Sequence, residues 1–224
     1  MRLLDLFGCA GGAARGYAQA GFEVVSVDIE PHNHWGVLLV MDWEEALDTL
    51  DLSKFDAIHA SPPCQGYTAL AAVHGNEWPK LIEPVRERLD AIGLPYVIEN
   101  VQGSPIRRDL VLCGEMFGLR VLRHRYFELG GWTMFQPEHV KHRGRVAGWR
   151  HGERYEGRYF AVYGEGGGKG SVAEWQDAMG IDWTDDRREL AEAIPPAYTR
   201  LIGEELRAFI GTPVTAVSGR EDER

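Results

Sequence analysis

Four short apolar runs alternate with stretches of helical spacing, and this alternation constrains the fold more than any other feature of the chain. The runs occupy residues 2–7, 22–28, 55–60 and 96–101. Helical spacing is found at residues 12–20, 43–50 and 78–92. Strands that alternate with helices form parallel sheets that are covered on both faces. The sequence therefore predicts an α/β fold with a doubly wound, mostly parallel sheet.

The second half of the chain continues this pattern less regularly. Further strands are expected at 111–114, 127–129 and 159–163, and further helices at 172–179, 185–193 and 196–210. The glycine-rich segment 164–171 does not match the phosphate-binding P-loop, so it is interpreted as a flexible loop. We predict a core at 1–127, a small inserted region at 128–185, returning helices at 186–211 and a disordered tail at 212–224.

Composition agrees with a single domain. A chain of 224 residues with 44% hydrophobic content can bury one substantial core. Three cysteines with no CxxC pair argue against a disulfide framework and against a zinc site, so no bound metal is expected. The sequence shows neither a charged-then-apolar leader nor an apolar run of about 18 residues, which predicts a cytoplasmic protein, with a monomer favoured.

Cys64 stands directly after the third apolar run, in the sequence SPPCQ at 61–65. Proline cannot donate a ladder hydrogen bond, so the strand must end here. Open α/β sheets bind their ligands at the carboxyl ends of the strands. A thiol that is held at such a position is a candidate nucleophile. The alternative is a half-buried structural cysteine after a turn.

The first two apolar runs end on features that suit a nucleoside cofactor. The first run leads into the glycine-rich turn FGCAGG at 7–12, and the second ends on Asp28. Glycine allows the backbone to approach a ligand closely, and an acid at the end of the second strand can accept both hydroxyl groups of a ribose. These two segments together predict a cofactor site at this edge of the sheet.

Two more segments carry polar side chains that could act on a substrate. The fourth apolar run ends on Glu99 and Asn100. Arg123 and Arg125 are two residues apart, so they share one face if the segment is extended.

In this order the motifs resemble those of the cytosine-5 DNA methyltransferases, and the small size resembles phage-type members. The resemblance covers residues 3–127 and 186–210, and it includes the segment AIPPAYTRLIG at 193–203, which is similar to the last motif of that family. It implies the Rossmann-like fold of S-adenosylmethionine-dependent methyltransferases, with S-adenosylmethionine as the methyl donor and double-stranded DNA as the partner. The last motif is expected to form a helix beside the first motif.

The resemblance also implies catalytic roles. Cys64 would add to C6 of a cytosine that has been flipped out of the duplex. Glu99 would hydrogen bond N3 and the exocyclic amine, with a pKa that burial raises. Arg123 and Arg125 would stabilise the adduct and orient Glu99. Asn100 is expected to hold the loop structure. Residues 65–78 would close over the base as a lid, with Gln65 contacting DNA.

A second group of residues is implied to bind the cofactor. Asp28 would bind the ribose, Ile29 would lie against the adenine, and Asp42 would accept from the adenine amine with Trp43 beside it. For Asp42 an equally good interpretation is a helix N-cap. The remaining expected contacts are Phe7, Gly8, Ala10, Gly11, Gly12 and Pro63.

The chain departs from the family pattern at three positions. Cys9 replaces the first glycine of the turn, and we expect Gly8 to absorb the resulting backbone strain. Val121 and Glu192 replace a glutamine and an asparagine. None of these residues carries the expected bond chemistry.

The charge distribution is uneven. The net charge is −10, yet residues 120–158 contain nine basic and four acidic residues, with four histidines among them. A basic segment with interleaved aromatics is typical of phosphate binding, and the alternative is an ordinary solvated loop. A region this small predicts a target of about two to four base pairs. The best candidates for contacting DNA here are Arg143, Arg145 and Arg150.

Three other functions are compatible with parts of the sequence. One is a cytosine-5 methyltransferase that acts on RNA such as tRNA, and another is a catalytically idle DNA-binding module. The third is a methyltransferase that acts on amino groups, which uses Asn-Pro-Pro-Tyr. The Pro-Pro-Cys sequence at 62–64 argues against it.

Overall fold

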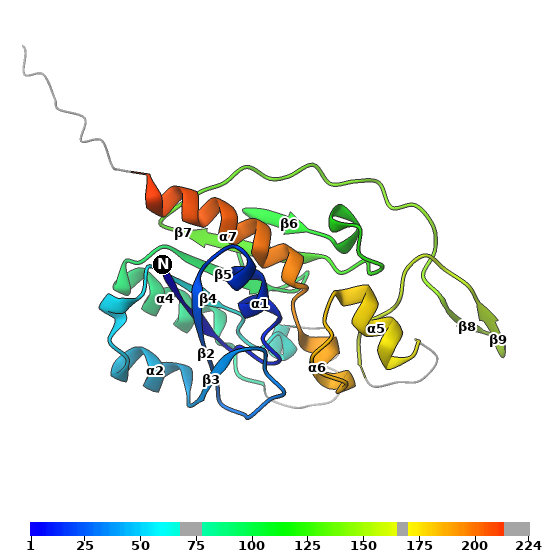
Figure 1. Ribbon diagram of the computed structural model, residues 1–224, viewed down its shortest axis with the longest axis horizontal. Helices are drawn as coiled ribbons and strands as arrows, with labels where there is room; N and C mark the ends of the chain where they lie inside the picture. Colours follow the sequence, from blue (N-terminus) through cyan, green and yellow to red (C-terminus); the bar gives the residue numbers. More distant parts are fainter. Residues whose placement is uncertain (68–77, 165–169, 213–224) are drawn as a thin grey trace, which may run out of the picture.

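The computed structural model of the protein describes residues 1–67, 78–164 and 170–212. Its main feature is a seven-stranded sheet with the order β3-β2-β1-β4-β5-β7-β6 (Figure 1). The strands are β1 (Arg2–Leu6), β2 (Glu23–Asp28), β3 (Val37–Val40), β4 (Ala57–Ala60), β5 (Tyr96–Asn100), β6 (Leu110–Leu112) and β7 (Arg125–Gly130). The first five pair in parallel, whereas β7 runs antiparallel to β5 and β6. The predicted fold class is therefore confirmed.

Helices cover both faces of this sheet. They are α1 (Gly12–Gln19), α2 (Trp43–Thr49), α4 (Ile82–Ile92), α5 (Val172–Met179), α6 (Arg187–Glu192) and α7 (Pro196–Gly211). Single turns of 3₁₀-helix lie at η1 (Leu52–Lys54), η2 (Gln65–Tyr67) and η3 (Gly114–Phe117). Apolar side chains of α1 and α7 pack on one face of the sheet, and those of α2 and α4 pack on the other. Among the described residues, no helix is both long and apolar enough to cross a membrane.

Helices α1 and α7 lie against each other because small residues let their backbones come close. A Cβ atom on Gly16 would be 2.0 Å from Oγ1 of Thr199, which is too close for any real side chain. The Thr199 hydroxyl donates a hydrogen bond of 2.9 Å to the carbonyl of Ala13. The C-terminal motif therefore lies directly beside the glycine-rich motif, although the two are far apart in the sequence (Figure 1).

The strand predicted at 159–163 was wrong. This segment forms only two isolated bridges, from Tyr159 to Val146 and from Phe160 to Val121. The apolar side chains that suggested a strand are used instead in a small third core with α5 and α6, where Phe160 packs together with buried Trp175. The segment is apolar, as expected, but its side chains are buried against α5 and α6 and not within a strand of the sheet.

Several other boundaries differ from the prediction. The sequence pattern missed β3 and the hairpin of β8 (Gly148–Arg150) and β9 (Glu153–Tyr155), since the hairpin is charged and shows no apolar alternation. Helix α4 starts at Ile82 and not at residue 78, because Pro84 has no amide hydrogen and is tolerated only in the first turn of a helix. Strand β7 crosses the expected boundary at residue 127. Most of the predicted lid at 65–78, the loop at 164–171 and the tail from 212 lies outside the described residues.

Candidate active site

The candidate site lies where the chain connections of the sheet change direction. Strands β1 and β4 are neighbours, but the chain leaves β1 toward β2 on one side and β4 toward β5 on the other. Such a switch point opens a crevice at the carboxyl ends of the strands. The glycine-rich turn follows β1 and Cys64 follows β4, while Glu99 is in β5 next to β4. The topology therefore brings the predicted cofactor turn and the predicted nucleophile to the same edge.

The turn after β1 has an unusual backbone. Phe7, Cys9 and Gly11 have φ angles of 61°, 43° and 81°, so two of the three left-handed residues carry a side chain. The expectation that Gly8 absorbs the strain was wrong, because Cys9 itself adopts the left-handed conformation. Asp28 holds the turn in place, since its Oδ2 atom accepts a hydrogen bond of 2.9 Å from the amide of Cys9. Strain of this kind is typical of ligand-binding turns.

Gly8 and Gly11 have no side chain because other residues pack against them. A Cβ atom on Gly8 would be 2.9 Å from Cβ of Ser26, and one on Gly11 would be 2.8 Å from Nε2 of His34. His34 therefore lies directly over the turn, which the sequence pattern did not reveal. Its imidazole has a lowered pKa because burial disfavours the charged ring.

Two residues that were predicted to contact the cofactor, Ala10 and Gly12, are in contact with other parts of the protein. The carbonyl of Ala10 accepts hydrogen bonds from the amide of Trp35 at 3.0 Å and from the indole of Trp183 at 2.7 Å. A Cβ atom on Gly12 would be 2.1 Å from the carbonyl oxygen of Ile194. Ala10 and Gly12 are therefore packed against Trp35, Trp183 and Ile194, and their contact with a cofactor stays a prediction.

The residues expected around the adenine differ in burial and in hydrogen bonding. Asp42 is the N-cap of α2, where its Oδ1 atom accepts from the amide of Glu44 at 2.8 Å, as the alternative interpretation proposed. Trp43 is buried, with its ring centroid 6.1 Å from that of Phe7. Ile29, in contrast, is 68% exposed directly after Asp28. An exposed apolar side chain beside a carboxylate suits an adenosine group.

The loop that carries Cys64 is fixed from the neighbouring strand. Asn100, at the end of β5, donates a hydrogen bond of 2.8 Å from Nδ2 to the carbonyl of Pro62, and its Oδ1 accepts from the amide of Val101 at 3.0 Å. This agrees with the structural role that was expected for Asn100. The carbonyl of Cys64 itself accepts from the amide of Tyr67 at 3.0 Å. The thiol therefore leaves a backbone that is held on both sides.

Glu99 and Arg125 form the charged centre of the site. Glu99 is buried, and Nε of Arg125 lies 2.7 Å from its Oε1 atom. Burial raises the pKa of the Glu99 carboxyl, and the positive charges of Arg125 and Arg123 only partly oppose this rise. A carboxyl group with a raised pKa can hold and deliver a proton near neutral pH.

The Cys64 thiol responds to the same charges. Burial raises its pKa, Arg125 lowers it, and Glu99 raises it again. The thiol form is therefore favoured at neutral pH, and the reactive thiolate increases as the pH rises. Because Arg125 acts on both groups, its guanidinium couples the nucleophile to the carboxyl group.

The ion pair with Glu99 is made by Arg125, whereas Arg123 acts on that carboxyl through its charge only, and its predicted contact with the adduct stays a prediction. Its guanidinium donates to the carbonyl oxygens of Val162, at 2.9 Å, and Ala191, and its own carbonyl accepts from the hydroxyl of Tyr198. Arg123 precedes β7, so the rule that residues two apart share a face of a strand does not apply to it. Arg123 fastens the segment before β7 to the C-terminal part of the chain.

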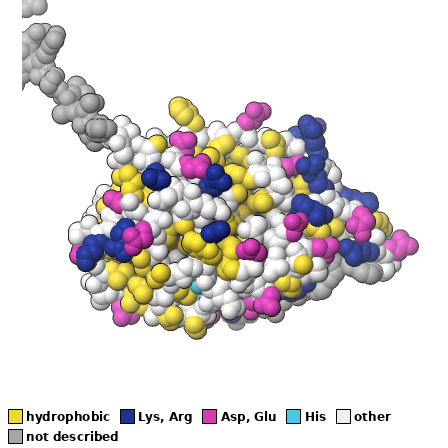
Figure 2. Space-filling view, viewed as in Figure 1, with side chains coloured by type: hydrophobic (Ala, Val, Ile, Leu, Met, Phe, Trp, Pro, Cys, Tyr) yellow, Lys and Arg dark blue, Asp and Glu magenta, His cyan; other side chains and the backbone are white. Residues whose placement is uncertain are grey.

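The basic segment is only partly free to bind phosphate. Figure 2 shows Lys and Arg side chains gathered at the end of the molecule where β8 and β9 lie, with acidic side chains among them. Arg145 donates to the carbonyl of Glu156 at 2.8 Å, and Arg158 lies 3.5 Å from Glu115. The side chain of Arg143 is exposed, and Arg150 is in β8. Gln65 follows Cys64 at the start of η2. Their contacts with DNA stay predictions.

Comparisons with known proteins agree with this arrangement. No family model matches the chain. Its sequence is 28% identical over 146 residues to the type II methyltransferase M.FnuDI of Fusobacterium nucleatum. That match covers 60% of this chain, which spans 40% of the length of the relative.

Solved structures of similar fold span nearly the whole chain. DNMT2 of Spodoptera frugiperda has a TM-score of 0.60 at 12% identity, and the match covers 92% of this chain and 99% of that one. Dnmt2 methyltransferase of S. pombe has a TM-score of 0.59 at 14% identity, covering 93% and 99%. The predicted Rossmann-like methyltransferase fold is confirmed, and the chain is similar in sequence to a type II methyltransferase and in fold to Dnmt2 methyltransferases.

Proposed function

We propose that the protein transfers a methyl group from S-adenosylmethionine to C5 of cytosine in double-stranded DNA. The observation that carries this proposal is the meeting of Cys64, buried Glu99 and Arg125 at the carboxyl ends of β4 and β5. A thiol, a carboxyl group of raised pKa and a fixed guanidinium are the groups that covalent activation of a cytosine ring requires.

The turn after β1 fits an adenosine-containing cofactor. Asp28 accepts from the amide of Cys9 at Oδ2 and from the amide of Glu30 at Oδ1, and Nε2 of His32 also lies 3.4 Å from Oδ1, so the second lone pair of Oδ2 is the one assigned to a ribose hydroxyl. Ile29 offers an exposed apolar surface beside it. We assign the ribose to Asp28 and the adenine to Ile29. S-adenosylmethionine supplies the methyl group when it is bound.

The protein side chains divide the remaining chemistry. The Cys64 thiolate adds to C6 of the cytosine, which makes C5 nucleophilic, and Glu99 gives its proton to N3 as negative charge develops in the ring. Arg125 holds Glu99 and stabilises the thiolate. After methylation the C5 proton passes to water, the proton on N3 returns to Glu99, and elimination of the Cys64 thiolate from C6 restores the aromatic ring.

RNA is the alternative substrate. The Dnmt2 structures share this fold, and a shared fold does not distinguish an enzyme that acts on DNA from one that acts on RNA. We favour duplex DNA because the curated relative is a type II methyltransferase. The purified protein should transfer labelled methyl groups from S-adenosylmethionine to cytosine C5 in duplex DNA and not in RNA transcripts of the same sequence. Nuclease digestion and mass spectrometry would locate the methyl group, and label found only in RNA would contradict the DNA assignment.

Asp28→Ala should weaken binding of S-adenosylmethionine by about tenfold or more, since a hydrogen bond to a charged group contributes about 1.5–3 kcal/mol. Isothermal titration calorimetry measures this directly. Asp56→Ala is the matched control, because Asp56 also accepts a hydrogen bond from a backbone amide, that of Arg2, on another part of the sheet. Equal affinity of Asp28→Ala and the wild type would show that the ribose is bound elsewhere.

A further inference from the structure

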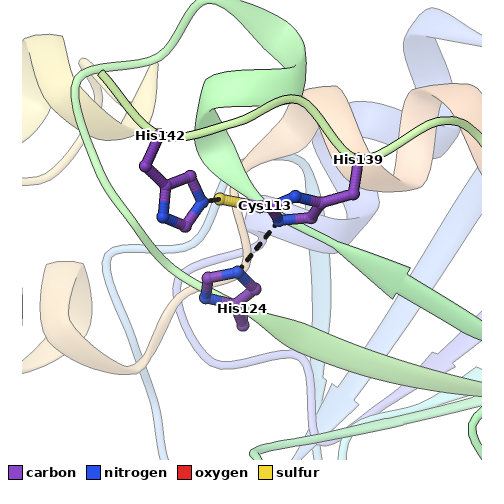
Figure 3. Close-up of side chains that lie close together, drawn as sticks. All are labelled: Cys113, His124, His139 and His142. Carbon is purple, nitrogen blue, oxygen red and sulfur yellow. Dashed lines mark hydrogen bonds between the residues drawn. The ribbon is translucent and has the colours of Figure 1, made fainter.

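One cysteine and three histidines outside the candidate active site point at a common centre (Figure 3). They are Cys113, His124, His139 and His142. One ligand atom of each lies within 4.8 Å of the ligand atoms of the other three. Sγ of Cys113 is 3.2 Å from Nε2 of His142, and Nε2 of His124 is 3.0 Å from Nε2 of His139. The four donors therefore converge although they come from three separate segments.

These separations match those of a tetrahedral zinc site. Zinc binds sulfur at about 2.3 Å and imidazole nitrogen at about 2.0–2.1 Å, so neighbouring ligand atoms in a tetrahedron are about 3.3–3.6 Å apart. The two short pairs lie just below this range, and the remaining pairs, which are separated by at most 4.8 Å, need to close by at most about 1.5 Å. A thiolate with three imidazoles is a donor set that zinc prefers.

The surroundings hold the ligands in place. Cys113 is buried between β6 and η3, and the amide of Glu115 donates a hydrogen bond to its sulfur. Next to His142, both the amide and the carbonyl of Arg143 hydrogen bond the hydroxyl of Tyr159, at 3.0 and 2.9 Å. These contacts hold the backbone beside Cys113 and next to His142 in place.

We propose that Cys113, His124, His139 and His142 bind one structural Zn²⁺ ion. Four protein ligands leave no position for a substrate, so the ion serves structure and not catalysis. This conclusion departs from the expectation of no metal, which considered only cysteine pairs. His139 and His142 lie three residues apart on the segment that runs from β7 to the β8–β9 hairpin (Figure 1).

The ion would join two parts of the molecule. Residues 131–147 contain no helix and no strand, and the proposed ion fastens this segment to the ends of β6 and β7. His124 lies between Arg123 and Arg125, so the same ion fixes the backbone from which Arg125 reaches Glu99. The metal site thus supports both the start of the basic segment and the geometry of the candidate active site.

The test is the metal content of the full chain, purified without a polyhistidine tag from zinc-supplemented medium. Mass spectrometry of the metals should find one zinc per chain. His139→Ala removes an exposed ligand with little effect on packing, and it should weaken zinc binding by more than about 100-fold in competition with a chelating dye, beyond the effect of losing an outer-shell partner. His151→Asn is the matched control, because His151 belongs to the same basic segment but not to the cluster.

A second measurement identifies the sulfur ligand. Replacing zinc by Co²⁺ should give a sulfur-to-cobalt charge-transfer band in the near ultraviolet, and Cys113→Ser should remove it. Chain without stoichiometric zinc, or zinc bound equally tightly by His139→Ala and by the wild type, would overturn the proposal. These readouts do not depend on methylation, so a zinc protein that fails to methylate cytosine would contradict the proposed function alone.

Discussion

Cys64→Ala is expected to abolish methyl transfer completely. If Cys64 adds to C6, duplex DNA that carries 5-fluorocytosine at the target position should remain covalently attached to the wild-type protein, because C5 cannot lose fluorine to complete the reaction. The Ala variant should form no such adduct, since no other group can make the bond to C6. A shifted band that survives denaturing electrophoresis measures the adduct, and peptide mapping identifies the attached residue.

The matched control for this experiment is Cys9→Ala. The Cys9 and Cys64 thiols both have a pKa above the ordinary value because of burial, so the two cysteines cannot be told apart by that property. They differ in position, since Cys64 lies beside Arg125 and Glu99, whereas the Cys9 sulfur faces Glu192 at 4.0 Å. Cys9→Ala should retain the adduct. If Cys64→Ala still forms the adduct and Cys9→Ala does not, then Cys9 and not Cys64 is the residue that adds to C6.

Glu99→Gln is expected to lower kcat by about 10²- to 10⁴-fold, the range for loss of a general acid. Gln keeps the shape of the side chain but has no proton to give to N3. Binding of S-adenosylmethionine should not change, because Glu99 is not part of the turn after β1. Single-turnover kinetics measures the rate, and calorimetry measures the binding. The control is Glu204→Gln, which alters an exposed carboxylate paired with Arg200 on α7.

The pH profile separates this role from a structural one. Glu99 acts in its protonated form and Cys64 as the thiolate, so the wild-type rate should rise with pH below both pKa values, level off between them and fall above both. The Cys64 thiolate has the opposite dependence, and it produces the rising limb. Glu99→Gln should lose only the falling limb. A slow variant with an unchanged profile would mean that Glu99 supports the loop without donating a proton.

Most of the sheet and its candidate functional edge could be predicted because β1, β2, β4 and β5 each end on a recognisable sequence signal. Two prolines end the strand before Cys64, a glycine-rich turn follows the first strand, and Asp28 ends the second. These signals are local, and the parallel order of an α/β sheet brings them together. The structure brings the predicted nucleophile Cys64, the carboxyl group of Glu99 and Arg125 together at this edge, while their catalytic roles stay predictions.

The partners of these residues could not be predicted in the same way, because they depend on contacts between distant segments. His34 over the turn and the carbonyls of Val162 and Ala191 around Arg123 are examples. The conformation of Cys9 is another, since Asp28 stabilises it from the next strand. The sequence pattern placed Arg123 and Arg125 on one face, but the strand begins only at Arg125.

The histidine cluster shows the same limit most clearly. In the sequence, His124, His139 and His142 belong to a basic segment, and the absence of a CxxC pair argues against a zinc site that includes Cys113. Spacing of ligands along the chain reveals a metal site only when the ligands are local. Here the third and fourth ligands are three residues apart, whereas the first directly follows β6 and the second directly precedes β7.

Bisulfite sequencing of plasmid DNA tests the central claim most directly. The plasmid is recovered from a host without cytosine methylation of its own that expresses either the wild type or Cys64→Ala. The wild type should protect cytosines within one recurring short sequence of about two to four base pairs, and Cys64→Ala should protect none. Plasmid DNA from the wild type in which every cytosine is converted would contradict methylation of duplex DNA at C5, and protection that persists in Cys64→Ala would contradict the role of Cys64.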